Sequence, residues 1–319
     1  MASTLALHRT NAYIAAADRL QVVDTGTGKT TATVRPRHKP VVRPDAEADA
    51  PVPTRDGQLM LVPSLVEFPG KGTTPSRVGI ELDAVSTSTN KTVWTVDLDD
   101  LPGGDAVTYG VDLESRKATW HKDHVGTAAV IGDTAVSVTS NDSVRQQVIG
   151  LDINHDGKQL WSKLDGYELT AHPAGPGLIA LTGKDYDSGD SLATVLKPNG
   201  SKAADFSGDP LGLTCRYDDA SVTVCQTEEP RTLALDAKTG KELWSLPEKG
   251  GNRVAPTVTA AWHGVVYGTT SNGPVALDAK TGADRSTSPG AAPVAVNEYT
   301  GVALDQADRR TLIAYPATG

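Results

Sequence analysis

Short apolar runs alternate with turn-forming residues along the chain. A polar or glycine-containing turn leads into an apolar run at several places, among them "VIGDTAVSV" (130–138), "AWHGVVYG" (261–268) and "EYTGVALD" (298–305). Runs of this length, rich in Val, Thr and Ala, are typical of β-strands joined by tight turns. The 31 glycines and 20 prolines agree with many turns. The pattern therefore predicts an all-β protein.

One hairpin-like unit recurs along the sequence. It is clearest as "TLALDAKTGKELW" (232–244) and returns as "PVALDAKTGADRS" (274–286), with weaker copies at 20–32, 79–94, 109–120 and 148–161. An apolar run ends in Asp, a short turn supplies Gly, and a second strand often ends near Trp. The Asp is expected to close the turn by accepting its N–H groups, and the Trp to pack on the neighbouring unit. The residues assigned to this frame are Asp24, Asp83, Trp94, Asp112, Trp120, Asp152, Trp161, Asp236, Trp244 and Asp278.

The spacing of these units predicts the blades of a β-propeller. A turn, a strand and then the Asp-turn-Trp hairpin make about four strands per repeat, and the period beyond Asp152 is roughly 40 residues. We expect a single domain over 1–319 with seven four-stranded blades and an extra hairpin near Ala106 to Trp120; eight blades are the alternative. The first strand, around Thr4 to Leu7, is expected to complete the last blade.

The repeated "ALDAKTGKELW" resembles the tryptophan-docking motif of the PQQ-like β-propeller family, and the residue usage resembles that of actinobacterial exported proteins or lipoproteins. That family includes quinoprotein dehydrogenases, the lipoprotein subunit of the outer-membrane assembly machinery, and ectodomains of membrane-bound Ser/Thr kinases. The enzymes are known for a vicinal cysteine pair, whereas Cys215 and Cys225 here are ten residues apart. The resemblance therefore implies a propeller without PQQ-dependent catalysis, and no cofactor is expected.

Charge and cysteine content limit the possible partners and compartment. The net charge of −9 argues against nucleic-acid binding, because a phosphate backbone is met by a basic surface. Cys215 and Cys225 flank a turn between two apolar runs, so a hairpin would place them opposite each other and suit a disulfide; two buried free thiols are the alternative. A disulfide would place the protein outside a reducing cytosol. No membrane span or signal is readable, so any signal or anchor is expected outside this sequence.

Three stretches imitate ligand sites. "VVDTGTGKTT" (22–31) is not a P-loop because Val23 stands where the first glycine is needed, so Lys29 is interpreted as a turn residue. Asp152, Asn154 and Asp156 imitate the start of a calcium loop, but Lys163 occupies the position of the bidentate acid, which makes them weak metal candidates. "WHKDH" places His121, Asp123 and His124 close in sequence, yet residues three apart on a strand face opposite sides, so an exposed connection is the favoured interpretation.

Two further segments stand out as surface features. "RPRHKPVVRP" (35–44) is basic and proline-rich, and is interpreted as an extended linker between blades; an anion- or partner-binding edge is the alternative. "VEFPGKGTTPSR" (66–77) lengthens one hairpin, and such insertions often carry binding; a tolerated surface insertion is the favoured interpretation. No nucleophile or zinc-protease motif occurs, so no catalytic or cofactor-binding residue is assigned.

These observations favour a non-catalytic propeller at the cell surface or outside the cell. It would act as a scaffold that binds a protein, a peptide or an envelope component, with membrane attachment only through a segment outside this sequence. The first alternative is the sensor ectodomain of a membrane-bound Ser/Thr kinase or a signalling lipoprotein. The second alternative is a quinoprotein-type enzyme, which the cysteine spacing and the chain length disfavour.

Overall fold

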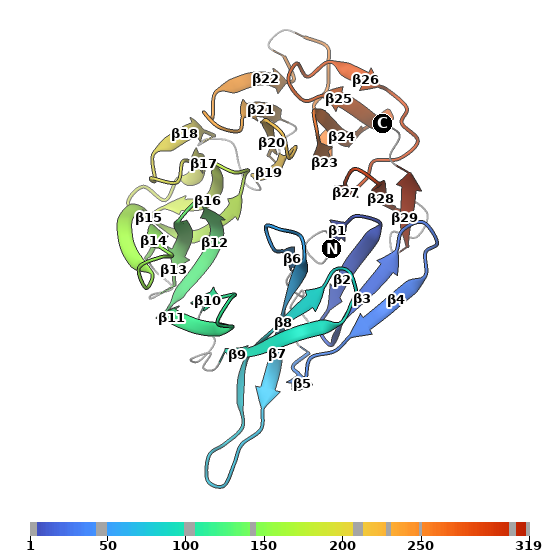
Figure 1. Ribbon diagram of the computed structural model, residues 1–319. Helices are drawn as coiled ribbons and strands as arrows, with labels where there is room; N and C mark the ends of the chain where they lie inside the picture. Colours follow the sequence, from blue (N-terminus) through green and yellow to red (C-terminus); the bar gives the residue numbers. More distant parts are fainter. Residues whose placement is uncertain are drawn as a thin grey trace. The chain divides into compact units, whose positions relative to one another are not determined.

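Every regular element of the described chain is a β-strand. The computed structural model describes residues 5–42, 50–98, 106–140, 145–206, 213–227, 231–248, 251–305 and 311–316. All strand pairs are antiparallel, and most sheets are meanders in which sequence neighbours pair (Figure 1). Several sheets have four strands and resemble propeller blades.

The chain divides into two compact units, which are described separately. Unit 1 comprises Met1–Gly104, Val111–Thr119 and Val294–Gly319, and unit 2 comprises Asp105–Gly110 and Trp120–Pro293. The two-stranded sheet of β10 (Val107–Asp112) and β11 (Lys117–Asp123) contributes residues to both units. This hairpin corresponds to the extra one expected near Ala106 to Trp120.

Unit 1 contains three sheets. The first sheet consists of β1 (Leu5–His8), β2 (Asn11–Ala16), β3 (Arg19–Asp24) and β4 (Thr30–Val34). The second consists of β5 (Lys39–Pro40), β6 (Val52–Pro53), β7 (Leu59–Phe68), β8 (Arg77–Ser86) and β9 (Thr92–Leu98). The third, at the C-terminal end, consists of β27 (Ala295–Val296), β28 (Thr300–Leu304) and β29 (Leu312–Pro316).

The described part of unit 2 contains a seven-stranded sheet and two four-stranded sheets. The seven-stranded sheet consists of β12 (Val125–Ile131), β13 (Thr134–Thr139), β14 (Gln146–Asp152), β15 (Lys158–Pro173), β16 (Ile179–Asp185), β17 (Ser191–Leu196) and β18 (Lys202–Asp205). The next consists of β19 (Thr214–Tyr217), β20 (Val222–Gln226), β21 (Thr232–Asp236) and β22 (Glu242–Leu246). The last consists of β23 (Thr257–Trp262), β24 (Val265–Thr270), β25 (Gly273–Asp278) and β26 (Asp284–Ser286).

The seven-stranded sheet joins two blade-like sets of strands through one long strand. The first part of β15 pairs with β14 up to Gly166, and the part from Gly166 to Pro173 pairs with β16. Leu164 and Glu168 have positive φ angles of 55°, and the register with both neighbours shifts nearby. Such breaks bend a strand, so β15 can serve two successive meanders.

The hydrophobic core lies between consecutive sheets within each unit. In unit 1, Tyr13 and Leu20 of the first sheet pack with Met60 and Val85 of the second. In unit 2, one cluster joins Val224 and Leu246 to residues of the last sheet, and others cover the seven-stranded sheet. Successive side chains of a strand point to opposite faces of its sheet, so the apolar ones gather on the face that packs against the next sheet.

One expectation about the chain ends is wrong. The first strand was expected to complete the last blade, but β1 pairs with β2 within the first sheet, and the C-terminal sheet has three described strands. The first and the C-terminal sheets are instead linked by a side chain, because Asn297 donates to the Arg9 carbonyl oxygen over 2.8 Å. Among the described residues no helix is long and apolar enough to cross a membrane.

Candidate functional site

The aspartates of the repeat close their own turns. Asp236 Oδ1 accepts hydrogen bonds from the Thr239 N–H (2.8 Å) and hydroxyl (2.7 Å), and Asp24 Oδ1 accepts the same pair from Thr27. Both donors favour the ionised carboxylate and so lower the pKa of Asp236. The Thr239 hydroxyl has the larger effect, and the Thr239 N–H has the next largest. Lys29 thus follows a turn that Asp24 closes.

The structure corrects one position of this frame. Asp83 lies within β8, where its carboxylate accepts a hydrogen bond from the Thr95 hydroxyl over 2.6 Å and is 4% exposed. The turn is closed by Ser86. Its carbonyl oxygen accepts the Asn90 N–H, and its own N–H donates to the Lys91 carbonyl oxygen, the same pair of backbone bonds that Asp236 makes. Trp94 follows Ser86 by eight residues, as Trp244 follows Asp236. Serine can fill the same position because its hydroxyl also bonds the turn backbone.

Three tryptophans dock on the next hairpin within unit 2. The indole N–H of Trp244 donates to the Ala279 carbonyl over 2.7 Å, and Trp161 donates to the Pro198 carbonyl over 2.9 Å. Trp120 makes the corresponding, longer contact of 3.4 Å to Ile153. Each ring also covers a glycine of that turn, and these glycines are Gly282, Gly200 and Gly157. In each case the indole N–H therefore joins successive repeats.

The two cysteines form a disulfide across a hairpin. Cys215 on β19 lies opposite Cys225 on β20, and both are buried in the core of unit 2. These residues therefore do not form a vicinal cysteine pair that could face a cofactor. The arrangement does not fit the cysteine chemistry that the resemblance associates with quinoprotein enzymes.

The calcium-like turn has its first carboxylate already engaged. Asp152 accepts the Asn154 N–H over 2.9 Å and the His155 Nδ1–H over 2.8 Å. These two interactions lower the pKa of Asp152, the Asn154 N–H first. Asp156 lies on the exposed turn with a positive φ of 51°. These residues function as a turn, in keeping with their place in the repeat.

"WHKDH" does not gather a ligand set in the described part of the chain. His121 Nε2 lies 3.9 Å from the Asp123 carboxylate, and both side chains are exposed on β11. His124 follows at the β11–β12 junction with a positive φ of 58°. The described residues contain one group of three potential ligands that lie close enough for a shared ion, and it is elsewhere.

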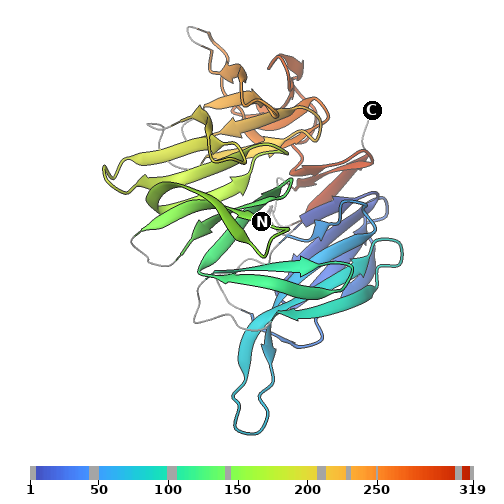
Figure 2. The same ribbon diagram turned by 60° about the vertical axis from the view of Figure 1, so that its left-hand side comes forward.

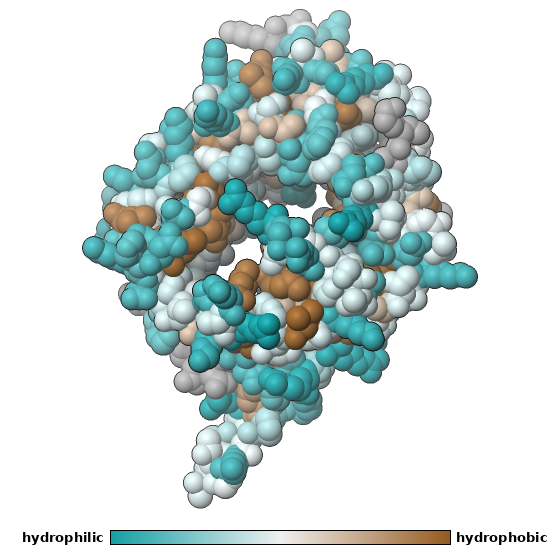
Figure 3. Space-filling view, in the orientation of Figure 1, coloured by the Kyte–Doolittle hydropathy of each residue, from teal (hydrophilic) through white to brown (hydrophobic). Residues whose placement is uncertain are grey.

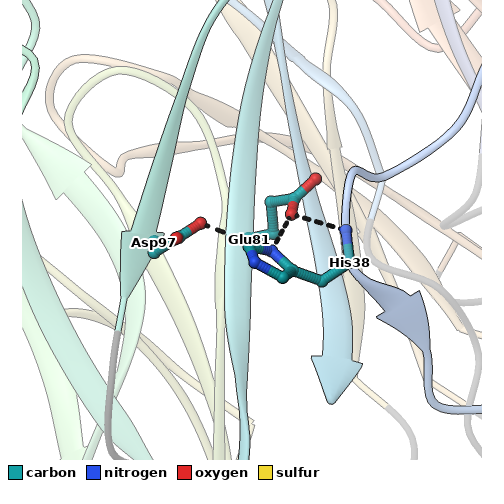
Figure 4. Close-up of side chains that lie close together, drawn as sticks. All are labelled: His38, Glu81 and Asp97. Carbon is teal, nitrogen blue, oxygen red and sulfur yellow. Dashed lines mark hydrogen bonds and ion pairs between the residues drawn. The ribbon is translucent and has the colours of Figure 1, made fainter. Parts of the chain in front are cut away.

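That group consists of His38, Glu81 and Asp97 on the second sheet of unit 1 (Figure 4). Glu81 belongs to β8 and is fully buried, whereas Asp97 on β9 is about one-third exposed. His38 precedes β5, and its Nδ1 lies 2.6 Å from Glu81 Oε2 and 3.7 Å from Asp97 Oδ1. Every member is thus within reach of a common point.

Backbone groups hold the basic segment against this cluster. The Arg37 N–H donates to Glu81 Oε1 over 2.5 Å, and the His38 N–H donates to Oε2 over 3.1 Å. The Arg37 guanidinium donates to Asp97 over 2.6 Å. The described part of the segment expected to be a linker or a binding edge, 35–42, is therefore fixed to β8 and β9; residues 43 and 44 lie outside the described residues.

The strands place acidic side chains on one face of the second sheet. Glu81 is directly opposite Asp97, and Asp83 is opposite Thr95, in the β8–β9 register. Burial raises the pKa of Asp83, against the effect of the Thr95 hydroxyl, and the nearby Glu81 charge adds to the rise. Phe68 contacts the His38 ring edge-on, with centroids 4.7 Å apart. Sequence reasoning missed this cluster, although charged residues at inward positions of "GIELDAVS" were an available signal.

The β7–β8 hairpin extends beyond its neighbouring strands. The two strands pair from Leu59–Ser86 to Phe68–Arg77, while the described residues of β9 pair with β8 as far as Ile80. The tip, residues 69–76, is exposed and contains an isolated bridge between Lys71 and Thr74. Both ribbon views show the hairpin projecting from its sheet (Figures 1 and 2), and its surface is pale to teal in Figure 3. This is the predicted lengthened hairpin.

A cavity of about 240 Å³ lies in unit 2 between β22 and the last sheet. Leu246, Pro256 and Leu277 contribute apolar lining, and Arg253 and Asp284 contribute charge. Arg253 donates to Asp284 over 2.8 Å and to the Gly282 carbonyl over 2.6 Å. The guanidinium is thus engaged by protein groups.

Known proteins resemble the chain along most of its length. A family model described as "Outer membrane protein assembly factor BamB" (PQQ_2) matches residues 16–314. No curated protein sequence matches. Among solved structures, one titled "Crystal structure of the eukaryotic initiation factor" shares 10% identity over 94% of this chain and 80% of that chain, with a TM-score of 0.52. At this identity the likeness concerns the fold alone.

Two further solved structures are less similar in shape. BamB from Moraxella catarrhalis shares 15% identity over 96% of this chain and 81% of its own, with a TM-score of 0.37. Kuenenia stuttgartiensis hydrazine synthase shares 14% identity over 84% of this chain and 92% of its own, with a TM-score of 0.47.

Proposed function

Since the chain belongs to the PQQ_2 family of β-propeller repeat proteins, we propose that it is a non-catalytic scaffold that binds a protein or a peptide. The family is described as an assembly factor for membrane proteins, and we propose a polypeptide ligand for this chain on that ground. The repeat's own Asp and Trp residues support this assignment, because they close turns and dock hairpins within the described structure.

The observation that carries the proposal is the exposed, projecting tip of the β7–β8 hairpin. Residues 69–76 are exposed, and an isolated bridge between Lys71 and Thr74 orders part of this tip. Exposed loops held on a rigid scaffold commonly carry binding residues. The projecting hairpin offers such a polar, exposed tip at residues 69–76.

The proposed architecture has seven blades. The β10–β11 hairpin is counted as the extra hairpin, and the seven-stranded sheet as two blades that share β15. With the two sheets at the N-terminal end, the two four-stranded sheets of unit 2 and the C-terminal sheet, this division supports the proposed number.

We place the scaffold outside the cytoplasm. The buried Cys215–Cys225 disulfide supports this location, because disulfides persist in oxidising compartments. The family description supports an envelope location.

The binding role is tested by shortening the hairpin. Residues 69–76 are replaced by Asn-Gly, which favours a two-residue turn and should leave the paired part of β7 and β8 intact. A matched control replaces the exposed residues 186–189 between β16 and β17 in the same way. Both variants are first compared with the parent by circular dichroism and melting temperature.

We expect the parent and the control to capture the same envelope polypeptide, and the shortened variant to lose it. The captured polypeptide is then purified, and calorimetry should show at least about a tenfold weaker Kd for the shortened variant. Equal affinity for all three proteins would contradict the role of the hairpin. Capture of no polypeptide by the parent would contradict the scaffold itself.

A further inference from the structure

We propose that His38, Glu81 and Asp97 bind one divalent transition-metal ion of the Zn²⁺ class. The three residues come from different segments, since His38 precedes β5, Glu81 lies on β8 and Asp97 lies on β9. Their ligand atoms lie within 4.8 Å of one another. The site is separate from the repeat's turn aspartates and from the β7–β8 hairpin tip.

The donor set and its spacing suit such an ion. An imidazole nitrogen and two carboxylate oxygens are ligands that Zn²⁺ accepts, with bonds of about 2.0–2.2 Å. Tetrahedral bonds of this length separate ligand atoms by about 3.3 Å. His38 Nδ1 is 3.7 Å from Asp97 Oδ1 and 2.6 Å from Glu81 Oε2. The ion would replace the proton shared by Nδ1 and Oε2, and these two atoms would move apart by less than 1 Å.

The charge arrangement favours a cation at this point. Glu81 and Asp97 are directly opposite each other on neighbouring strands, a like-charged pairing that ordinarily destabilises a sheet. Glu81 is fully buried, so its charge is poorly screened by water. A divalent ion between the two carboxylates would compensate both charges.

The site is held rigidly on one side and is open to solvent on the other. Two backbone N–H groups, from Arg37 and His38, fix the Glu81 carboxylate. Phe68 packs against the His38 ring and limits its rotation. The His38 and Asp97 side chains are 20% and 34% exposed, so an ion can enter from solvent and keep a water as its fourth ligand.

Arg37 is the competitor for this site. Its guanidinium donates to the same Asp97 oxygen that faces His38, over 2.6 Å. The Arg37 side chain is 58% exposed, so it can leave Asp97 at little cost. Removing the guanidinium should therefore leave the affinity for the ion unchanged or make it tighter.

The test measures Zn²⁺ binding to the full chain after treatment with a chelator. Calorimetry on the parent should give one Zn²⁺ per chain, and Co²⁺ should give a visible absorption spectrum typical of direct coordination. His38→Ala and Asp97→Ala should each weaken Zn²⁺ binding by about 100-fold or more. Arg37→Ala should bind at least as tightly as the parent.

His155→Ala is the matched control, because His155 forms an exposed pair with Asp152 over a similar distance of 2.8 Å. It should bind Zn²⁺ like the parent. The proposal is overturned if the parent takes up no stoichiometric Zn²⁺, if His38→Ala binds normally, or if His155→Ala weakens binding as much as His38→Ala. Because Asp97 is partly exposed, its variant decides the matter even if substitution at Glu81 prevents folding.

Discussion

At the residue scale, the turn carboxylates make the fold sensitive to acid. Among the described residues, hydrogen bonds lower the pKa of seven turn aspartates, which are Asp24, Asp56, Asp112, Asp152, Asp185, Asp236 and Asp278. A lowered folded-state pKa contributes stability that is present above the unfolded-state value and is lost as the pH falls through the folded-state value. We therefore expect the denaturant midpoint to fall steeply below about pH 4.

One substitution isolates this effect. Asp236→Asn keeps an oxygen that can accept the Thr239 N–H but removes the charge, so its loss of stability between pH 6 and pH 3 should be smaller than that of the parent. Asp156→Asn, at an exposed turn position, is the control and should follow the parent curve. Parallel curves for the parent and Asp236→Asn would contradict the assignment. Urea titrations at a series of pH values supply the midpoints.

At the scale of the element, two glycines at equivalent turn positions allow the cost of backbone strain to be measured apart from the cost of disturbing tryptophan docking. Gly28 and Gly282 occupy the same turn position with φ of 67° and 69°. A Cβ at Gly28 would meet nothing within 4 Å, whereas at Gly282 it would lie 2.7 Å from the Trp244 ring. Gly28→Ala should cost about 1 kcal/mol of unfolding free energy from strain alone. Gly282→Ala should cost about 1–3 kcal/mol more, because the indole must also move.

Urea unfolding followed by circular dichroism measures both free energies. The tryptophan emission of Gly282→Ala should shift to longer wavelength and that of Gly28→Ala should not, since only the Gly282 variant displaces the Trp244 ring from the turn that it covers. Equal costs for the two variants would show that the Trp244 docking contact contributes little to stability.

The same elements show what the sequence could predict. Strands and turns followed from local patterns, because Asp, Thr and Gly act on groups only a few residues away. The frame failed at Asp83 because Ser86 performs the turn role in its place. The His38–Glu81 pairing was beyond prediction, since it joins residues 43 apart through a non-repeating segment. Repeat periodicity carries no information about such a contact.

At the scale of the whole molecule, Asn297 links the first sheet of unit 1 to the C-terminal sheet of the same unit. This residue is 6% exposed, accepts the N–H groups of Tyr299 and Thr300 at 2.9 Å each, and donates to Arg9 of the first sheet. A blade pattern alone places the first strand in the last blade, whereas the structure links two separate sheets by a side chain. The stability of residues 5–16 should therefore depend on the C-terminal sheet.

Asn297→Ala tests this dependence. The substitution should lower the unfolding free energy by about 2–3 kcal/mol, because a buried side chain loses its hydrogen bonds and Arg9 loses a donor. Asn199→Ala is the control, since the Asn199 side chain also accepts two bonds from its own turn, both from Ser201, but bonds to no other sheet among the described residues. Hydrogen exchange followed by mass spectrometry should then show faster exchange at 5–16 and 295–304 in Asn297→Ala, while Asn199→Ala changes only 191–205. Unchanged protection at 5–16 would mean that the two sheets keep their stability without this link.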